Sequence, residues 1–118
     1  MKFDIRERTK KFGIRIVNLV KKFPKDIAGQ ELGRQLIRSG TSVGANLEEA
    51  DAAATRKDFF HKTSISLKEA KESSYWLDVI LDSKLLNNQS NIEEAKSLRS
   101  EAFELCRILF SIVNPKKI

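Results

Sequence analysis

The residues best suited to chemistry are four carboxylates near the middle of the chain. Glu48 and Glu49 lie in one segment, and Glu69 and Glu72 lie in the next, so two antiparallel helices would bring the pairs to a similar depth. Paired carboxylates can act as a general acid and a general base. The alternative is ion pairing with basic neighbours, which are Arg34, Arg38, Lys68 and Lys71. We favour ion pairing, so the sequence predicts a protein that is not an enzyme.

Histidine and cysteine are equally uninformative about catalysis. His61 is the single histidine, whereas a di-iron bundle needs a Glu-x-x-His motif from each of two helices. Cys106 is the single cysteine, which excludes an internal disulfide and a cysteine-based zinc site. Its place in an apolar stripe is typical of packing. The sequence therefore predicts no catalytic residue, no metal site and no cofactor.

A run of small residues, GTSVG, covers Gly40 to Gly44. It is not a nucleophile elbow, which needs G-x-S-x-G at a turn from strand to helix, and no Lys-Ser/Thr follows to make a phosphate loop. Small residues at near-heptad spacing favour close approach of helix backbones, so we predict a small-residue seam between the second and third helical segments. Ser39, Gly40, Gly44 and Ala70 are predicted to pack there. Asn46 and Glu49 are predicted to make buried or half-buried hydrogen bonds.

Apolar residues at helical spacing divide the chain into four helices. Pro24 and Pro115 stand where the first and last of these should stop. Short links make successive helices antiparallel neighbours, so the prediction is an all-α, up-down-up-down four-helix bundle in one domain over residues 1–118. The run Gly40-Thr41-Ser42 is predicted to weaken and kink the second helix locally, and Asn91 is predicted to cap the fourth. The predicted helices cover residues 4–23, 27–55, 57–85 and 91–113.

The fourth predicted helix carries two apolar stripes. One stripe steps by three and four from Ala95 to Ile112, which suffices for a single core face. The second stripe lies beside it and consists of Phe103, Cys106, Phe110 and Val113. Two stripes bury more surface than three partner helices need, which indicates a subunit interface. A wide core face is an equally open interpretation.

The net charge of +6 is concentrated near the N-terminus, where residues 1–38 hold 11 basic and 4 acidic side chains. Such a basic excess predicts contacts with nucleic acid phosphates, or else a solvated face that keeps the protein in solution. No apolar run approaches the roughly 20 residues of a membrane span, and no secretory leader is visible, so we expect a cytoplasmic protein without a membrane partner. The candidate phosphate contacts are Lys10, Lys11, Arg15, Lys21, Lys22, Arg34 and Arg38.

Two sequence blocks carry a family resemblance. The stretch from Gln35 to Ala50, QLIRSGTSVGANLEEA, resembles the signature of the 23S rRNA-intervening-sequence protein family, also called the four-helix-bundle proteins. The stretches Lys57 to Lys62, Ile65 to Ser73 and Tyr75 to Leu77 resemble the family's second block, in order and at family-like spacing. The resemblance covers most of the chain and is weakest in the first and fourth helical segments.

The resemblance implies a small bacterial protein, since some members are encoded inside insertions within 23S rRNA genes. The family is similar to the accessory subunit of diversity-generating retroelements, a basic pentameric bundle that binds nucleic acid and a reverse transcriptase. A homo-oligomer, most simply a pentamer, without enzymatic activity or cofactor is thereby implied. The present chain differs in charge, because residues 39–83 hold 5 basic and 8 acidic side chains. Two functions stay open: weak, charge-driven binding of structured RNA or DNA, and a protein-interaction scaffold without nucleic acid.

Overall fold

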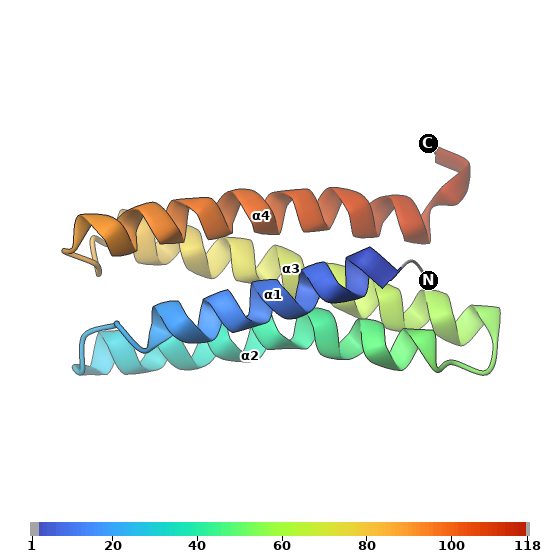
Figure 1. Cartoon of the computed structure of the whole chain (residues 1–118), viewed down its shortest axis with the longest axis horizontal. Helices are drawn as coiled ribbons and strands as arrows, with labels where there is room; N and C mark the ends of the chain where they lie inside the picture. Colours follow the sequence, from blue (N-terminus) through green and yellow to red (C-terminus); the bar gives the residue numbers. More distant parts are fainter. Residues whose placement is uncertain (1–2, 118) are drawn as a thin grey trace.

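Four long helices make up almost all of the computed structural model, which describes the backbone of residues 3–117 and the side chains of residues 4–116. The helices are α1 (Phe3–Val20), α2 (Ile27–Asp51), α3 (Arg56–Asp82) and α4 (Gln89–Val113), followed by the short 3-10 helix η1 (Pro115–Lys117). The connections lie at alternate ends of the molecule, so each helix runs antiparallel to the next (Figure 1). The described chain contains no strand. The predicted all-α four-helix bundle is confirmed.

The helices form a square arrangement. α1 packs against α2 and α4, and α3 also packs against α2 and α4, whereas the diagonal pairs do not approach one another within the described residues. The side formed by α1 and α2 is therefore opposite the side formed by α3 and α4. A helix rises about 1.5 Å per residue, so helices of this length give an elongated body. It measures 45 × 24 × 19 Å.

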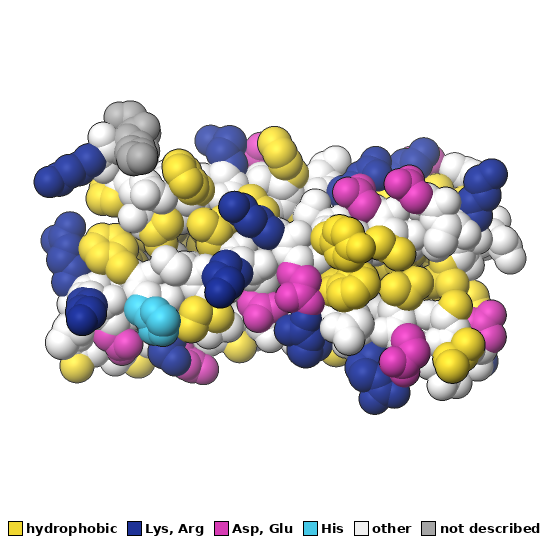
Figure 2. Space-filling model, turned by 180° about the vertical axis from the view of Figure 1, so that it is seen from behind, with side chains coloured by type: hydrophobic (Ala, Val, Ile, Leu, Met, Phe, Trp, Pro, Cys, Tyr) yellow, Lys and Arg dark blue, Asp and Glu magenta, His cyan; other side chains and the backbone are white. Residues whose placement is uncertain are grey.

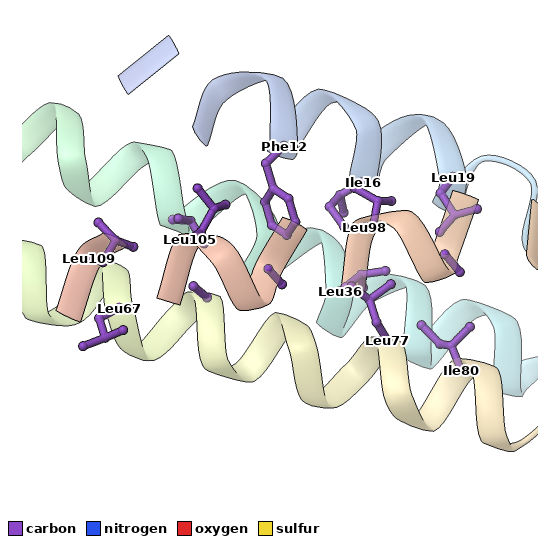
Figure 3. Packing of buried hydrophobic residues seen from close by; sticks show 14 of the residues in the cluster. Phe12, Ile16, Leu19, Leu36, Leu67, Leu77, Ile80, Leu98, Leu105 and Leu109 are labelled. Carbon is purple, nitrogen blue, oxygen red and sulfur yellow. The ribbon is translucent and has the colours of Figure 1, made fainter. Parts of the chain in front are cut away.

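The core is built from one apolar stripe of each helix. Residues spaced by three and four positions share a helix face, and burying that face removes its apolar surface from water. Figure 3 shows these side chains pointing from the four helices toward a common centre. Among the largest fully buried residues are Phe12, Ile16, Leu19, Leu36, Leu47, Leu77, Ile80, Leu98, Leu105 and Leu109.

Side-chain caps fix where three of the helices begin. Asp26 accepts a hydrogen bond from the Gly29 backbone N–H at 2.8 Å and caps α2. Thr55 does the same for α3 through the Asp58 N–H. In α4 the cap is Asn88, which accepts from the Asn91 N–H at 3.1 Å. The prediction that Asn91 caps α4 is therefore wrong, because the side chain three residues earlier already satisfies its N–H.

Three helices end earlier than predicted. α1 ends at Val20 rather than residue 23, α2 at Asp51 rather than 55, and α3 at Asp82 rather than 85. α2 cannot continue through Thr55, because that residue adopts an extended conformation to cap α3. Lys84 has a φ of 58°, the left-handed conformation that commonly follows the end of a helix.

The weak point predicted in the second helix is absent, since α2 is continuous from Ile27 to Asp51. Its hydroxyl residues bond back to their own helix: Thr41 Oγ1 donates to the Ile37 carbonyl and Ser42 Oγ to the Arg38 carbonyl. These local bonds satisfy the polar side chains without breaking the helix. Among the described helices, none combines the length and apolar character that a membrane crossing requires.

Candidate nucleic-acid interface

The predicted lysine contacts lie along α1 and directly after its last residue. Lys10, Lys11, Lys21 and Lys22 are exposed, and none forms an ion pair with another described side chain. All four avoid the core face of α1, because the apolar stripe takes that side. Lys10 and Lys21 are separated by eleven residues, as are Lys11 and Lys22, so each pair is aligned about three turns apart. The lysines therefore form two short rows along the helix, which we call the α1 lysine rows.

Arg15, by contrast, links α1 to α4. Its Nε donates to Glu94 Oε2 at 2.9 Å, and its Nη2 donates to Glu94 Oε1 at 3.0 Å and to Ser97 Oγ at 2.8 Å. The hydrogen bond with Glu94 raises the pKa of the guanidinium. A planar guanidinium matches a carboxylate at two points, which a lysine ammonium does not. Arg15 is therefore committed to holding two helices together.

The two predicted arginines of α2 are also occupied. Arg38 forms ion pairs with both Glu69 and Glu72 of α3. Arg34 is more exposed and lies 3.5 Å from Glu31 on its own helix. The seven predicted contacts thus separate into four lysines that face solvent and three arginines that already have carboxylate partners.

Two further lysines lie at the end of the bundle where α1 finishes. Lys25 lies in the α1–α2 connection and Lys84 in the α3–α4 connection, and Figure 1 shows both connections at the same end of the bundle. Both side chains are exposed, as are Lys21 and Lys22 at this end. Neither Lys25 nor Lys84 was among the predicted phosphate contacts. Their place at the same end of the bundle as Lys21 and Lys22 follows from the antiparallel turns, and a charge count along the chain carries no signal for it.

The four carboxylates considered for acid/base chemistry pair with cations of neighbouring helices instead. Glu48 of α2 accepts two hydrogen bonds from Arg6 of α1, at 2.7 and 3.2 Å, which lowers the pKa of Glu48. Glu49 of α2 pairs with Lys62 of α3 at 2.8 Å. Glu69 and Glu72 share Arg38 as described above. Ion pairing, the interpretation favoured from sequence, is found at each of these carboxylates. Of the four predicted partners, however, Arg38 alone takes part, and the other two cations are Arg6 and Lys62 rather than Arg34, Lys68 or Lys71.

The remaining reactive side chains are not gathered into a site. His61 is exposed near the start of α3. Cys106 is half-buried beside the core, and burial raises the pKa of its thiol. Across the described side chains, no three of His, Cys, Asp and Glu lie together in a way that could hold a metal ion.

The predicted second stripe of α4 lies outside the core. Phe103 and Phe110 are 68% and 47% exposed, whereas Cys106 and Val113 are half-buried and pack against the core edge. Figure 2, which shows the side of the bundle that faces away in Figure 1, has its main hydrophobic cluster toward the end that carries the α1–α2 and α3–α4 connections, which is not the end where α4 finishes with Phe110 and Val113. Tyr75 of α3 is also exposed and meets Trp76 edge to face.

The small residues of the signature lie at two interfaces of α2. Ser39 and Ala70 are fully buried between α2 and α3, where the Ser73 hydroxyl lies 2.9 Å from Ser39 Oγ. Gly40 and Gly44 face α1 instead: a Cβ at Gly40 would lie 2.9 Å from Ile16 Cγ1, and one at Gly44 would lie 3.3 Å from Thr9 Oγ1. The predicted single seam between the second and third helices is corrected accordingly.

The two polar signature residues behave differently from each other. Asn46 is half-buried and its Nδ2 donates to the Ser42 carbonyl at 2.8 Å. Glu49 is exposed, so the hydrogen bond it makes with Lys62 lies at the surface rather than in the interior as predicted. The two residues differ in their position around the helix axis. Asn46 borders the buried face of α2, whereas Glu49 lies farther from that face.

Comparison with known proteins places this bundle in a family. The family described as 23S rRNA-intervening sequence protein matches residues 1–111. The chain belongs to the 23S rRNA-intervening sequence protein family. The resemblance identified from the two sequence blocks is thus confirmed, and the match includes α1 and most of α4, where the resemblance was weakest.

A solved structure supports the assignment to the 23S rRNA-intervening sequence protein family. It is described as a protein of unknown function from the S23 ribosomal protein family of Bacteroides thetaiotaomicron. It is 35% identical to this chain, covers 92% of this chain and 97% of its own, and superposes with a TM-score of 0.80. No curated protein matches the chain.

Proposed function

We propose that this chain is a non-enzymatic, cytoplasmic, oligomeric bundle that binds structured RNA or DNA through the α1 lysine rows. The observation that supports the proposal is that the predicted arginine contacts have carboxylate partners, whereas the predicted lysine contacts have none among the described residues. Arg15 and Arg38 are held between helices by carboxylates, whereas the lysines of α1 face solvent without ion-pair partners among the described residues. Exposed ammonium groups along α1 and directly after its last residue are available to phosphates.

The binding we propose is weak for one subunit and strengthened by assembly. Each phosphate neutralised by a lysine releases condensed counterions, which makes binding depend steeply on salt. In an oligomer the lysine rows recur on every subunit, so several weak contacts add by multivalency. We propose a homo-oligomer, with the pentamer as the number that the family resemblance implies. The exposed Phe103 and Phe110 support the interface.

The test is a salt series of binding isotherms with a structured RNA and a duplex DNA. The variant replaces Lys10, Lys11, Lys21 and Lys22 with Gln. We expect it to weaken binding to all sequences alike. We also expect it to flatten the dependence of log affinity on log salt by about 0.9 for each duplex phosphate that the variant no longer neutralises.

A matched control removes the same charge from elsewhere. Lys57, Lys68, Lys71 and Lys116 are likewise exposed and lie outside α1, so their replacement with Gln gives an equal change in net charge. The control should bind almost as well as the wild type. Equal losses of affinity in both variants would show that net charge, and not the α1 lysine rows, attracts the nucleic acid. No binding by the wild type even at low salt would contradict the proposal.

The alternative is a protein-interaction scaffold, and the exposed aromatic residues favour it. Tyr75 is 59% exposed, and Phe103 and Phe110 add exposed aromatic surface on α4. Aromatic residues in such positions are typical of protein interfaces. Copurification from the native cell, with bound RNA and bound protein identified together, distinguishes the two functions. A stoichiometric protein partner without RNA would favour the scaffold.

A further inference from the structure

An apolar groove runs along the outer surface between α1 and α2. Its volume is about 370 Å³, which is within the range of pockets that hold small ligands. Gly13, Gly44 and Ala45 leave its floor hollow, and Ile14, which is 50% exposed, forms part of a wall. A flat apolar group that enters the hollow removes this lining from water, which is favourable.

The residues that continue the two walls place a cation of each helix at one end of the groove. Lys21 follows Ile14 by seven residues, which is about two turns, so it lies on the same side of α1. The Lys21 backbone N–H donates to the Val17 carbonyl at 3.1 Å, so the helical path continues this far. Arg34 precedes Thr41, another lining residue, by seven residues of α2. Because the helices are antiparallel, Lys21 and Arg34 both lie toward the α1–α2 connection (Figure 1).

The packing at this end agrees with that placement. Val20 lies against Gly33, where a Cβ would be 2.9 Å from Val20 Cγ1, and these two residues are the chain neighbours of Lys21 and Arg34. Lys21 is exposed and has no ion-pair partner among the described residues. Arg34 is also exposed and lies 3.5 Å from Glu31. Such an exposed pair contributes little stability, so the guanidinium is available to a phosphate.

The opposite end of the groove has balanced charges. Arg6 donates two hydrogen bonds to Glu48 and pairs with Asp51 at 2.9 Å. Lys10, on the rim at this end, lies near enough to Glu48 to assist Arg6 in lowering the pKa of that carboxyl. Two cations and two carboxylates thus meet here. An anion is therefore attracted to the end with Lys21 rather than to this one.

A nucleotide has the matching distribution of polarity. The two faces of its base are flat and apolar, whereas its phosphate carries the charge. Proteins hold unstacked bases against aromatic or apolar side chains, while cations hold the backbone. The apolar hollow suits the base, and the end with Lys21 and Arg34 suits the phosphate. A base within a duplex is stacked on its neighbours and cannot enter, whereas an unpaired base can.

We propose that the α1–α2 groove receives one unpaired nucleobase of a bound RNA or DNA, whose phosphate lies on Lys21 and Arg34. The inference rests on the nucleic-acid binding of the proposed function and names the kind of nucleic acid that binds best. Bulged and single-stranded nucleotides are preferred over a fully paired duplex. The lining discriminates little between bases, because its floor and wall present apolar surface rather than a pattern of donors and acceptors.

The test compares two RNA hairpins that differ only in one base. Both contain the same single-nucleotide bulge, and in one of them the bulged nucleotide is abasic, so the two hairpins carry equal numbers of phosphates. We expect the wild type to bind the hairpin with the bulged base about fivefold more tightly, which is the lower end of what stacking of one base contributes. A micromolar concentration of adenosine monophosphate should leave this preference intact.

Two variants alter the groove without changing the net charge. Ala45→Leu fills the hollow from an exposed position of α2, and Ile14→Asn removes apolar surface from the wall. Each should abolish the preference for the bulged base while leaving the affinity for the abasic hairpin unchanged. Ala28→Leu and Ile27→Asn make the same changes at exposed positions outside the lining, so they should keep the preference.

The exposed aromatic rings test whether the base stacks elsewhere. Tyr75 of α3 is 59% exposed and Phe103 of α4 is 68% exposed. Tyr75→Ala and Phe103→Ala should both leave the preference intact. Its loss in either variant would place the base on that ring and overturn the groove. Circular dichroism spectra and cooperative melts check that all six variants are folded.

The remaining outcomes separate the groove from the proposed function. Equal affinity of the wild type for the two hairpins would overturn the groove and leave the charge-driven binding standing. No binding to either hairpin at low salt would overturn the proposed function itself. Loss of the preference in the presence of adenosine monophosphate would assign the groove to free nucleotides instead. A lower sedimenting mass for Ala45→Leu than for the wild type would show that another protein chain covers the groove, which also overturns the inference.

Discussion

α2 packs closely against both of its neighbours, but it uses different residues on the two sides. Toward α1 it presents glycines: a Cβ at Gly33 would lie 2.9 Å from Val20 Cγ1, and one at Gly40 would meet Ile16 equally closely. Toward α3 it presents hydroxyls and carbonyls. Ser39 lies against Ser73, and Ser66 Oγ donates to the Val43 carbonyl at 2.6 Å.

The difference shows that small residues serve two purposes in one bundle. Glycine supplies space and no directional bond, so the α1–α2 interface depends on shape and tolerates no added atoms where the aliphatic side chains of α1 enter. Buried serines supply directional bonds, so the α2–α3 interface depends on aligned donors and acceptors. Overpacking should therefore damage the first interface, and removal of a hydroxyl should damage the second.

The largest effect is expected from Gly40→Leu at the α1–α2 interface. Its Cβ alone would lie within 3.0 Å of two Ile16 carbons, so the longer side chain forces α1 away. We expect a loss of about 3 kcal/mol in the free energy of unfolding, measured by chemical denaturation. Ala28→Leu, at an exposed position of the same helix, should change it by less than about 0.5 kcal/mol. Equal stability of the two variants would contradict the glycine interface.

Ser73→Ala should have a smaller effect at the α2–α3 interface. The Ser73 hydroxyl lies 2.9 Å from both Ser39 Oγ and the Glu69 carbonyl, and removing it leaves a buried hydroxyl with a poorer partner. We expect a loss of about 1 kcal/mol in the free energy of unfolding. A double-mutant cycle with Ser39→Ala provides the control, because removing both hydroxyls should cost less than the sum of the single changes. Strict additivity would show that the two serines are not coupled.

Gly13→Ala should stabilise the protein, unlike the substitution of Gly40 in the same α1–α2 interface. Gly13 faces α2, yet a Cβ there would lie 3.6 Å from Thr41 Cα, an ordinary contact distance. Alanine in a helix interior is favoured over glycine by about 0.5–1 kcal/mol. We expect the midpoint of thermal unfolding to rise. A fall would mean that the α1–α2 interface has no spare room even at its most open glycine.

The smallest expected effect is a pH dependence of stability, which comes from the ion pair between Arg6 of α1 and Glu48 of α2. Arg6 lowers the pKa of Glu48 below its ordinary value of 4.5, so the ion pair stabilises the folded protein above that pH. The contribution is lost as the pH falls through the lowered pKa, when Glu48 becomes protonated in the folded state. The difference in thermal midpoint between wild type and Glu48→Gln should be small at pH 6 and should shrink as the pH is lowered toward 3. A gap that widens in acid would contradict this sign.

Much of the fold followed from spacing along the chain. Core residues such as Phe12, Leu36 and Leu98 recur every three or four positions, and that period determines which face of a helix is buried. The predicted ends of the helices were less accurate. Asn88 and Asn91 are the same residue type, and only the backbone path shows which of them can reach a free N–H.

The candidate site was predictable only in part. The basic excess of the N-terminal segment is visible in a charge count, but the division between Arg15, which is paired, and Lys11, which is not, depends on a carboxylate 79 residues away. Lys84 could not be added from sequence, because the turn that brings it to the lysine end belongs to the other half of the chain.

The sequence by itself determined four helices, their order and the apolar stripe of each, because these are local properties of residue type and period. The tertiary structure decided which neighbour each remaining face meets. It turned Gly40 toward α1 and Ser39 toward α3, although they are adjacent in the chain. It also left Phe103 outside the core. The physical reason is that a helix fixes the angle between its own side chains, whereas only packing fixes what lies at each angle.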